Sequence, residues 1–373
     1  MRAAVLEAFG APMPVRELTL RDPDEHEVLV RTVAAPFCST DWLGWRAMRG
    51  KKPPVVLGHT ALGVVERCDA RCAFARDRGY GVGDLVVVAG TPQCDACFYC
   101  GIGRPDQCAR LFDRPEPVIA TDSIDGPVRA AGGVGAYAEF VLADRSQVWP
   151  VRSSLPAPHL SLLGCGITTG HGAIVNVAEV PPGASVAVVG LGHLGLWCVQ
   201  AARVAGAGRI IGVDLLADRR ATAAGLGATD VVDPTQGDPV EQVRSLTEGR
   251  GADVVVEAAG PEQAVQQAVA MSRRAGTVVL TGVQWADGRI SLPQNAVAIH
   301  GRRILSCQNG QSVMSRDLPR CVELLESGEY DARPIVTARY TLDRINEALH
   351  ASGEFRDLSG VITSFRHQPP TQE

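Results

Sequence analysis

The sequence predicts an α/β protein in which a doubly wound parallel-sheet domain is combined with a mainly-β domain. Up to about residue 155, short β-rich runs are separated by Gly, Pro and Asp, as in a domain built from strands and turns. From about Leu160 onward, strand-like runs alternate with Ala-rich helical stretches, which is typical of βαβ units around a parallel sheet. A glycine-rich motif between one of these strands and the next helix predicts a Rossmann cofactor domain.

The individual elements follow from the hydrophobic pattern and the turn residues. A first strand is expected at the N-terminus, and further strands of the mainly-β region are expected at 27–33, 61–67 and 84–89. The strands expected in the parallel sheet are 185–190, 209–214, 230–232, 253–257 and 277–281. The expected helices are 193–207, 219–226, 239–247, 262–273 and 318–327. The segment 340–351 leads to a last strand at 359–365, and the polar tail 367–373 is expected to be disordered.

Length and composition exclude several classes of protein. The 373 residues suit two domains, and 46% hydrophobic with 21% charged residues is the profile of a soluble globular chain. A net charge of −5 gives no electrostatic reason to expect a nucleic-acid partner, and no apolar run approaches the roughly 20 residues that cross a membrane. The N-terminal stretch carries Glu7 and no long apolar run, so we expect no signal peptide and a cytoplasmic location.

The glycine-rich motif, Gly-Leu-Gly-His-Leu-Gly at 190–195, predicts a dinucleotide site. Its first glycine permits a tight turn, its second lets the backbone approach a pyrophosphate, and its third lets helix pack on strand. Asp214 ends the next strand, where a carboxylate accepts hydrogen bonds from the ribose of NAD and repels the 2′-phosphate of NADP. We therefore expect NAD. The residues expected to contact it are Gly190, Gly192, His193, Leu194, Gly195, Asp214 and Arg219.

Cysteine spacing predicts two zinc sites. Clustered cysteines in a reducing compartment are more often metal ligands than disulfides, and four thiolates leave zinc no open position, as in structural sites. That cluster is Cys94, Cys97, Cys100 and Cys108. A dispersed second set, Cys38, His59 and Cys165, offers three ligands and an open fourth position, as in catalytic zinc sites.

Taken together, these motifs resemble those of the zinc-dependent medium-chain alcohol dehydrogenases over nearly the whole chain. The motifs that carry the resemblance are Cys38-x-Thr40-Asp41, Gly58-His59, Thr91-Pro-Gln-Cys94 with the three following cysteines, residues 163–170, and residues 186–195 with 210–214. The family implies a GroES-like catalytic domain at 1–160, with a structural-zinc lobe at about 90–110. It also implies a Rossmann NAD-binding domain inserted at 161–311, and a return to the catalytic domain at 312–366.

The resemblance implies roles for further residues. Thr40 would pass the substrate's hydroxyl proton toward solvent, and Asp41 would orient the ligand His59. Thr169 would lie against the nicotinamide, and Arg356 near the pyrophosphate. The implied reaction is hydride transfer between a small-molecule alcohol and NAD, with two zinc ions per chain, in a homodimer or homotetramer.

The chain departs from the family's pattern at several positions. Thr60 stands where a Glu usually follows the ligand histidine, and Leu43 stands where some members continue the proton relay with a histidine. Gly90 replaces a residue that is often bulky, so we expect a substrate larger than ethanol. A basic stretch could receive an anionic group on the substrate, although a solvated loop is the favoured explanation. Its residues are Arg46, Arg49, Lys51 and Lys52.

Two other functions remain open from the sequence. One is a reductase of the same fold that reduces a carbonyl or activated alkene in one direction. The other is a non-catalytic NAD(H)-binding redox sensor, although a sensor has no need of an open metal position. Zinc dependence and alcohol-driven NADH formation distinguish these hypotheses.

Overall fold

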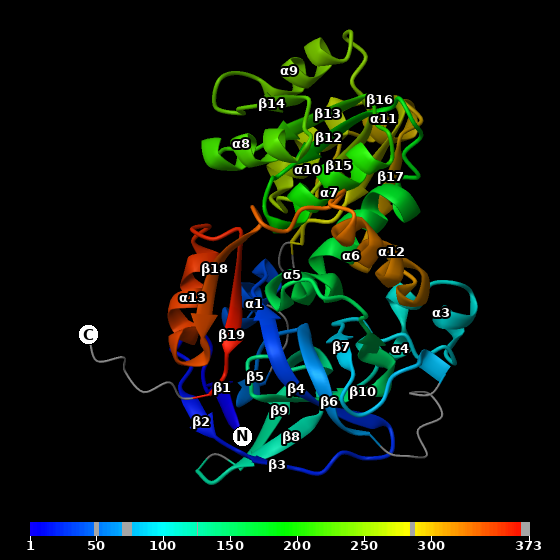
Figure 1. Cartoon of the computed structure of the whole chain (residues 1–373). Helices are drawn as coiled ribbons and strands as arrows, with labels where there is room; N and C mark the ends of the chain where they lie inside the picture. The colour runs from blue at the N-terminus through cyan, green and yellow to red at the C-terminus, as the bar shows by residue number, and fades with distance from the viewer. Residues whose placement is uncertain (48–51, 69–76, 125, 284–287, 367–373) are drawn as a thin grey trace. The chain divides into compact units, whose positions relative to one another are not determined.

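Mostly antiparallel strands make up the chain before Cys165, and a parallel sheet follows it (Figure 1). This computed structural model describes residues 1–47, 52–68, 77–124, 126–283 and 288–366. The chain divides into two compact units: unit 1 combines Met1–Cys165 with Ile335–Glu373, and unit 2 is Gly166–Pro334. The expected disordered tail at 367–373 lies outside the described residues, as do Arg49 and Lys51 of the basic stretch.

Unit 1 is built on two sheets. The first has the order β2-β1-β5-β9-β8-β3, with β1 (Arg2–Leu6), β2 (Val15–Glu17), β3 (Thr19–Leu20), β5 (Val55–Val56), β8 (Val118–Asp122) and β9 (Gly126–Ala130). The second has the order β11-β7-β6-β4-β19-β18, with β10 also paired to β4. Its strands are β4 (Glu27–Pro36), β6 (Ala61–Cys68), β7 (Leu85–Val88), β10 (Phe140–Asp144), β11 (Val148–Pro150), β18 (Val336–Thr341) and β19 (Ser359–Ser364). Because β19 pairs with β4, the end of the chain completes a sheet that its beginning started, which confirms the predicted insertion.

Short helices of unit 1 carry several site residues. They are α1 (Ser39–Trp45), α3 (Phe98–Gly101), α4 (Ala109–Phe112), α5 (Ala157–Leu160) and α13 (Ile345–Gly353). Trp42 and Trp45 of α1 stack with ring centroids 4.7 Å apart, and a Cβ at Gly353 of α13 would overlap the Trp42 ring. This close packing fixes α1, which carries Thr40 and Asp41, against α13.

Unit 2 contains one six-stranded sheet in which every pairing is parallel. Its order is β14-β13-β12-β15-β16-β17, so the order reverses between β12 and β15. The strands are β12 (Ser185–Val189), β13 (Arg209–Val213), β14 (Asp230–Val232), β15 (Ala252–Glu257), β16 (Ser272–Leu280) and β17 (Arg303–Ser306). Five of these were predicted, but β17, which is short and half-buried, was not. The reversal defines the edge at which such sheets bind dinucleotides.

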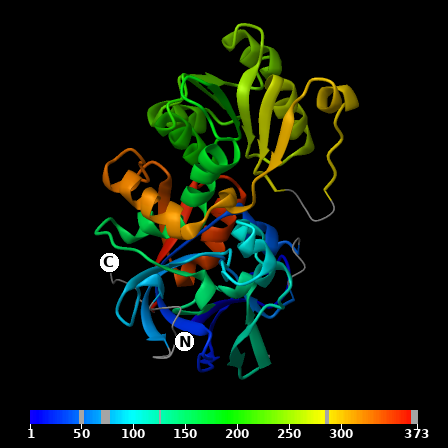
Figure 2. The ribbon, with the colours of Figure 1, turned by 90° about the vertical axis from the view of Figure 1, so that its right-hand side faces the viewer.

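Helices pack on this sheet in two groups, α7 beside α8 and α9 beside α10, as in a doubly wound fold (Figures 1 and 2). The helices of the unit are α6 (Gly166–Gly172), α7 (His193–Val204), α8 (Ala217–Leu226), α9 (Pro239–Leu246), α10 (Glu262–Met271), α11 (Gln294–Ala298) and α12 (Met314–Glu326). No single helix among the described residues is long and apolar enough to span a membrane. Among the described residues, one bent pair of helices, Ala157–Gly164 with Gly166–Val177, meets those criteria by length and composition alone.

The second boundary between the units differs from the expected one. Residues 312–334 belong to unit 2, so this unit ends at Pro334 rather than at residue 311. The reason is that α12 and the turn before it pack on α6: the Ser312 hydroxyl donates to Thr168 O at 3.0 Å, and the Asn176 amide donates to Asp317 at 2.9 Å. These contacts join residues far apart in sequence, so the strand–helix pattern gave no sign of them.

Candidate functional site

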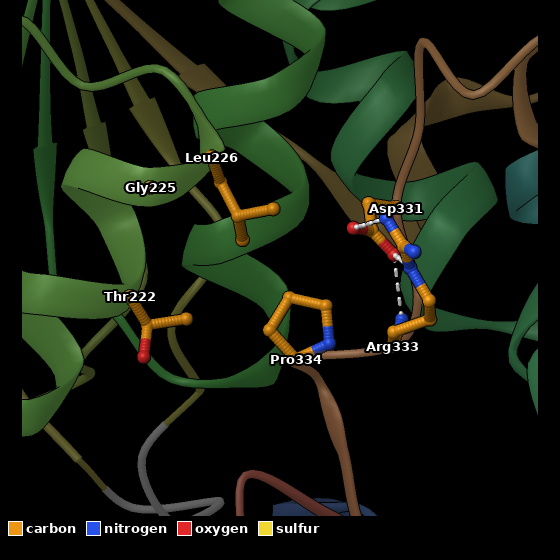
Figure 3. Close-up of a pocket in the computed structure, with 6 residues that line it drawn as sticks. All are labelled: Thr222, Gly225, Leu226, Asp331, Arg333 and Pro334. Atoms are coloured by element: carbon orange, nitrogen blue, oxygen red, sulfur yellow. Dashed lines mark hydrogen bonds and ion pairs between the residues drawn. The ribbon is translucent and has the colours of Figure 1, made fainter.

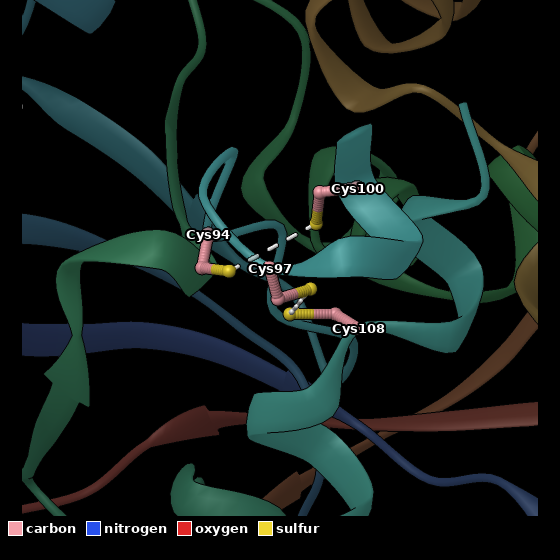
Figure 4. A group of neighbouring side chains, drawn as sticks. All are labelled: Cys94, Cys97, Cys100 and Cys108. Atoms are coloured by element: carbon pink, nitrogen blue, oxygen red, sulfur yellow. Dashed lines mark hydrogen bonds between the residues drawn. The ribbon is translucent and has the colours of Figure 1, made fainter. Parts of the chain in front are cut away.

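Four cysteine side chains converge in the lobe that follows β7, with their sulfur atoms facing one another (Figure 4). The sulfurs of Cys94 and Cys100 are 3.9 Å apart, and those of Cys97 and Cys108 are 4.0 Å apart. A disulfide requires about 2.0 Å, whereas sulfurs bound tetrahedrally to zinc at about 2.3 Å lie about 3.8 Å apart. The spacing therefore fits a zinc ion and does not fit disulfides.

The electrostatics of this cluster also favour a bound cation. Partial burial acts to raise the pKa of the Cys97 thiol, but N–H groups of Cys100 and Ala109 lower it to about 6. Burial and the neighbouring thiols raise the pKa of Cys100. Four thiols this close cannot all ionise without a positive charge among them, and zinc supplies that charge.

Arg78 holds the four-cysteine lobe in place, and the sequence gave no indication of this residue. Its guanidinium lies 3.5 Å from the ring centroid of Trp149 and donates to Gln93 O at 2.6 Å and to Asp95 at 3.2 Å. Gln93 and Asp95 flank Cys94, so one arginine binds the backbone carbonyl on one side of the first ligand and a side-chain carboxylate on the other. Recognising it from sequence would have required knowing that Trp149 lies beside the lobe.

Cys38, His59 and Cys165 come from three segments of unit 1 and bring their ligand atoms within 4.8 Å of one another. Cys38 precedes α1, His59 lies between β5 and β6, and Cys165 directly precedes α6. The Nε2 atom of His59 is buried and has no hydrogen-bond partner among the described residues, as expected of a nitrogen that faces a metal. Burial opposes a charge on His59, but Asp41 and Cys165 raise its pKa well above the ordinary value. The site thus favours a cation, and this donor set fits zinc.

Asp41 orients the histidine of this set. Both of its carboxylate oxygens lie close to His59 Nδ1, at 3.2 and 3.1 Å, which leaves Nε2 for the metal. The same carboxylate accepts the N–H of Gly58 at 3.2 Å and that of Cys38 at 3.3 Å. Gly58 has φ +90°, and a Cβ there would lie 2.8 Å from the Cβ of Ala136, so only glycine fits at this turn. The structure thus brings Asp41 and two predicted ligands together.

Two of the departures from the family pattern pack directly on this site. A Cβ at Gly90 would lie 2.8 Å from His59 O, so glycine is required here whatever the size of the substrate. Thr60 is 1% exposed and donates its hydroxyl to Val88 O at 2.9 Å. A Cβ at Gly164 would overlap that hydroxyl, so Thr60 fills the space beside the residue that precedes Cys165.

The glycine motif of unit 2 has the predicted local geometry. Gly190 has φ +90°, and a Cβ there would lie 2.8 Å from the backbone N of Ala259. A Cβ at Gly195 would overlap Gly190 O, so this glycine allows the helix to approach the turn. Gly192 precedes α7, whose first two residues are the half-buried His193 and Leu194. The N–H groups of this helix end lie at the carboxyl ends of the strands, where a phosphate is bound in Rossmann folds.

Asp214 and Arg219 flank this motif with opposite charges. The carboxylate of Asp214 accepts the N–H of Leu191 at 2.7 Å and that of Leu216 at 2.8 Å. The Arg219 guanidinium lies 4.0 Å from that carboxylate and 3.6 Å from the position of a Cβ on Gly192. Burial lowers the pKa of Arg219, and the Asp214 carboxylate acts in the opposite direction. Asp214 therefore provides a carboxylate that a ribose could bind, and Arg219 provides a positive charge near the glycine motif.

The remaining predicted cofactor residues lie in different units. Thr169 of α6 donates to the side-chain oxygen of Asn309 at 3.4 Å. The Asn309 amide nitrogen is buried with no hydrogen-bond partner in the part of the chain that the structure describes, and both Asn309 and Gln311 have φ +48°. Such a strained turn is typical of a binding site. The sequence did not predict it, because positive φ values are expected at glycine and not at Asn309 or Gln311. Arg356, in unit 1, is exposed and pairs with Glu354 at 3.0 Å.

Glu257 is a further site residue that the sequence analysis missed. It ends β15 fully buried, and one oxygen accepts the N–H of Ala259 at 2.8 Å and that of Gly260 at 2.6 Å. Its other oxygen has no hydrogen-bond partner among the residues that the structure describes, and burial raises the pKa of Glu257 against the opposing effect of those N–H groups. Because Gly190 packs against Ala259, Glu257 supports the segment on which the glycine motif rests. The sequence did indicate a buried acid here, because Glu257 directly follows three valines of a predicted strand.

A surface pocket of unit 2 lies apart from these predicted site residues (Figure 3). Its lining residues are Thr222, Gly225, Leu226, Asp331, Arg333 and Pro334. The Arg333 guanidinium donates to both carboxylate oxygens of Asp331, at 2.9 and 2.8 Å. The charge of this arginine is thus already paired with a carboxylate of the same pocket.

Comparisons with known proteins agree with this geometry. Residues 24–153 match the family model of the alcohol dehydrogenase GroES-like domain, and residues 194–327 match that of a zinc-binding dehydrogenase. A relative from Synechocystis sp., S-(hydroxymethyl)glutathione dehydrogenase, is 31% identical over 97% of this chain and 99% of its own. Benzyl alcohol dehydrogenase from Acinetobacter calcoaceticus superposes with a TM-score of 0.89 at 29% identity, over 98% of this chain and 99% of that one. A Sinorhizobium meliloti 1021 protein bound to NADP gives 0.80 at 27% identity, over 97% and 98%.

Substitutions at Thr60 test its fit beside Cys165. Thr60→Val removes the buried hydrogen bond to Val88 O and should cost about 0.5–1.5 kcal/mol of stability. Thr60→Glu must also bury a longer, charged side chain, so it should lower the melting temperature further and weaken metal retention at Cys165. Thr60→Ser keeps the hydroxyl and is the matched control. Melting temperature and zinc content after dialysis against a chelator are the measurements; a Glu variant as stable and as zinc-rich as the wild type would contradict this account.

The buried Glu257 carboxyl predicts a pH dependence of stability. Because its folded-state pKa is raised, its contribution to folding is full below its unfolded-state pKa and is lost as pH rises through its folded-state pKa. Glu257→Gln cannot ionise. The difference in melting temperature between Glu257→Gln and the wild type should therefore shift in favour of Glu257→Gln as the pH is raised from 5 to 8. The exposed Glu241→Gln is the control, and parallel melting curves for Glu257→Gln and wild type would count against the prediction.

Proposed function

The chain belongs to the zinc-dependent alcohol dehydrogenases of the medium-chain dehydrogenase/reductase superfamily, and we propose that it oxidises an alcohol larger than ethanol to an aldehyde or ketone, with NAD as hydride acceptor. The observation that carries this proposal is the convergence of Cys38, His59 and Cys165 with the His59 Nε2 unpartnered. Three protein ligands leave a fourth position for the substrate oxygen. A zinc ion bound there would supply a Lewis acid that lowers the pKa of the alcohol.

The chain's own groups would handle the proton. Thr40 follows the ligand Cys38 in α1, and its hydroxyl lies 3.8 Å from the Cys38 sulfur. That hydroxyl can accept the proton that the alcohol releases and donate its own onward. Leu43 cannot continue the transfer, so the proton would leave through water or a ribose hydroxyl. Asp41 keeps His59 in the orientation that the ligand set requires.

Asp214 supports NAD as the cofactor. Its carboxylate is held at the end of β13 by two backbone N–H groups and still has lone pairs for the ribose hydroxyls. A 2′-phosphate would meet that negative charge, although Arg219 lies 4.0 Å away and one structural relative binds NADP. NAD supplies the hydride acceptor.

The substrate is proposed to be larger than ethanol on the strength of the relatives, since Gly90 has its own structural reason. The similar proteins are named for benzyl alcohol and for S-(hydroxymethyl)glutathione, both larger than ethanol. The second of these carries carboxylates, and the basic stretch offers exposed cations at Arg46 and Lys52. Oxidation of an anionic alcohol is therefore the second candidate.

A substrate panel with NAD tests the proposal. We expect NADH formation with benzyl alcohol or S-(hydroxymethyl)glutathione at a kcat/KM about tenfold or more above that with ethanol. His59→Ala should abolish it. If S-(hydroxymethyl)glutathione is preferred, Arg46→Ala should raise its KM at low salt and leave that of benzyl alcohol unchanged. Zinc-independent reduction of a carbonyl or alkene without alcohol oxidation would favour the reductase. NADH binding with no turnover would favour the sensor.

Exchange of the Asp214 carboxylate tests the cofactor. In Asp214→Ala, kcat/KM with NAD should fall about tenfold or more, and the ratio of NADP to NAD use should rise. The carboxylate that binds one cofactor and repels the other is then absent. Asp230→Asn, on the neighbouring strand, is the matched control and should leave the ratio unchanged. Equal use of NAD and NADP by the wild type would contradict the assignment.

Two further expectations stay predictions. They are the cytoplasmic location and the assembly into a homodimer or homotetramer. Fractionation of the source cells and light scattering on the purified protein test them.

A further inference from the structure

His193 occupies space that a side chain on Gly166 would otherwise fill. A Cβ at Gly166 would overlap the imidazole Nε2 of His193, and two further ring atoms would lie at 2.6 and 2.7 Å. Both residues belong to unit 2, Gly166 at the start of α6 and His193 at the start of α7. The two helix ends are therefore in direct contact.

The backbone gives no reason for glycine at position 166. This residue is helical and is not among the glycines with positive φ. Alanine is favoured over glycine in a helix by about 1 kcal/mol. The histidine ring is therefore the obstacle to a side chain at this position.

A second contact joins the same two helices further along. A Cβ at Gly170 would overlap the Cβ of Trp197 and would lie 3.2 Å from the backbone N of Cys198. The two helices thus touch at two levels: the Gly170–Trp197 contact packs the helices together further along, and the His193 ring links their first residues. The start of α7 follows the phosphate-binding motif, and the start of α6 directly follows the metal ligand Cys165.

We propose that His193 is a positioning residue that couples cofactor binding at the start of α7 to the metal ligand Cys165, so that bound cofactor slows loss of the metal. A cofactor that holds the start of α7 would hold His193, and through it Gly166 and the adjoining Cys165. By linkage, the metal-loaded protein would bind cofactor more tightly. This inference rests on the proposed function, because it requires NAD(H) and zinc at their proposed sites.

Zinc release from the holoenzyme tests the coupling. The protein is mixed with a chromophoric chelator, with and without NADH at saturating concentration, and released zinc is followed by absorbance. We expect NADH to slow release from the Cys38, His59 and Cys165 site about fivefold or more in the wild type. Release from the four-cysteine lobe should not change and serves as an internal control. In His193→Ala, saturated with NADH at its own measured Kd, the slowing should disappear.

A size exchange tests the contact itself. Gly166→Ala should weaken NADH binding in the wild-type background, because its methyl group displaces the His193 ring. In the His193→Ala background, the same substitution should leave NADH affinity unchanged and should not lower the melting temperature. An equal effect of Gly166→Ala in both backgrounds would overturn the proposal, as would equal slowing of zinc release by NADH in wild type and His193→Ala.

The proposed function and the coupling through His193 can be tested separately. If NADH does not bind the wild type, or if the Cys38 site holds no zinc, both the proposed function and the coupling are wrong. If both ligands bind and zinc release does not depend on His193, only the coupling is wrong.

Discussion

The Asp41 carboxylate is the interaction on which the candidate catalytic centre depends. It contacts His59 Nδ1 and accepts backbone N–H groups from Gly58 and Cys38, so one buried side chain fixes two of the three metal ligands. Asp41 is itself held because α1 packs tightly on α13 through the Trp42–Gly353 contact. The strand β19 that follows α13 pairs with β4, which precedes Cys38. The return of the chain into the sheet that contains β4 thus supports the metal site.

Close backbone approach is the second constraint, and it acts at two positions that depart from the family pattern, Gly90 and Thr60. Gly90, Gly164 and Gly166 each lie against a particular neighbour, respectively the His59 carbonyl, the Thr60 hydroxyl and the His193 ring. At these positions the identity of one residue determines which side chain its neighbour can have. The metal site is therefore adapted to threonine at position 60, and a change there must be judged against Gly164 as well as against zinc.

Much of the fold and the site could be predicted from local pattern. The ligand spacing, the glycine motif and the alternation of strands with helices are local features, and the structure contains them. Features that depend on distant contacts could not be predicted in this way. The edge strand β17 is only partly buried, Arg78 acts through Trp149, and residues 312–334 join unit 2 through Thr168 and Asn176. Glu257 lay at a predictable strand end, but its role required knowing that Ala259 packs on Gly190.

The central claim is that the chain holds two separate zinc sites, one closed by four thiolates and one open to substrate. Elemental analysis of the purified protein, as zinc per chain, tests it most directly. We expect about two zinc ions per chain in the wild type. We expect about one zinc ion per chain in Cys165→Ser, because this substitution removes a ligand of the open site. A wild-type value of about one that does not change in Cys165→Ser would contradict it, because only the four-cysteine lobe would then bind metal.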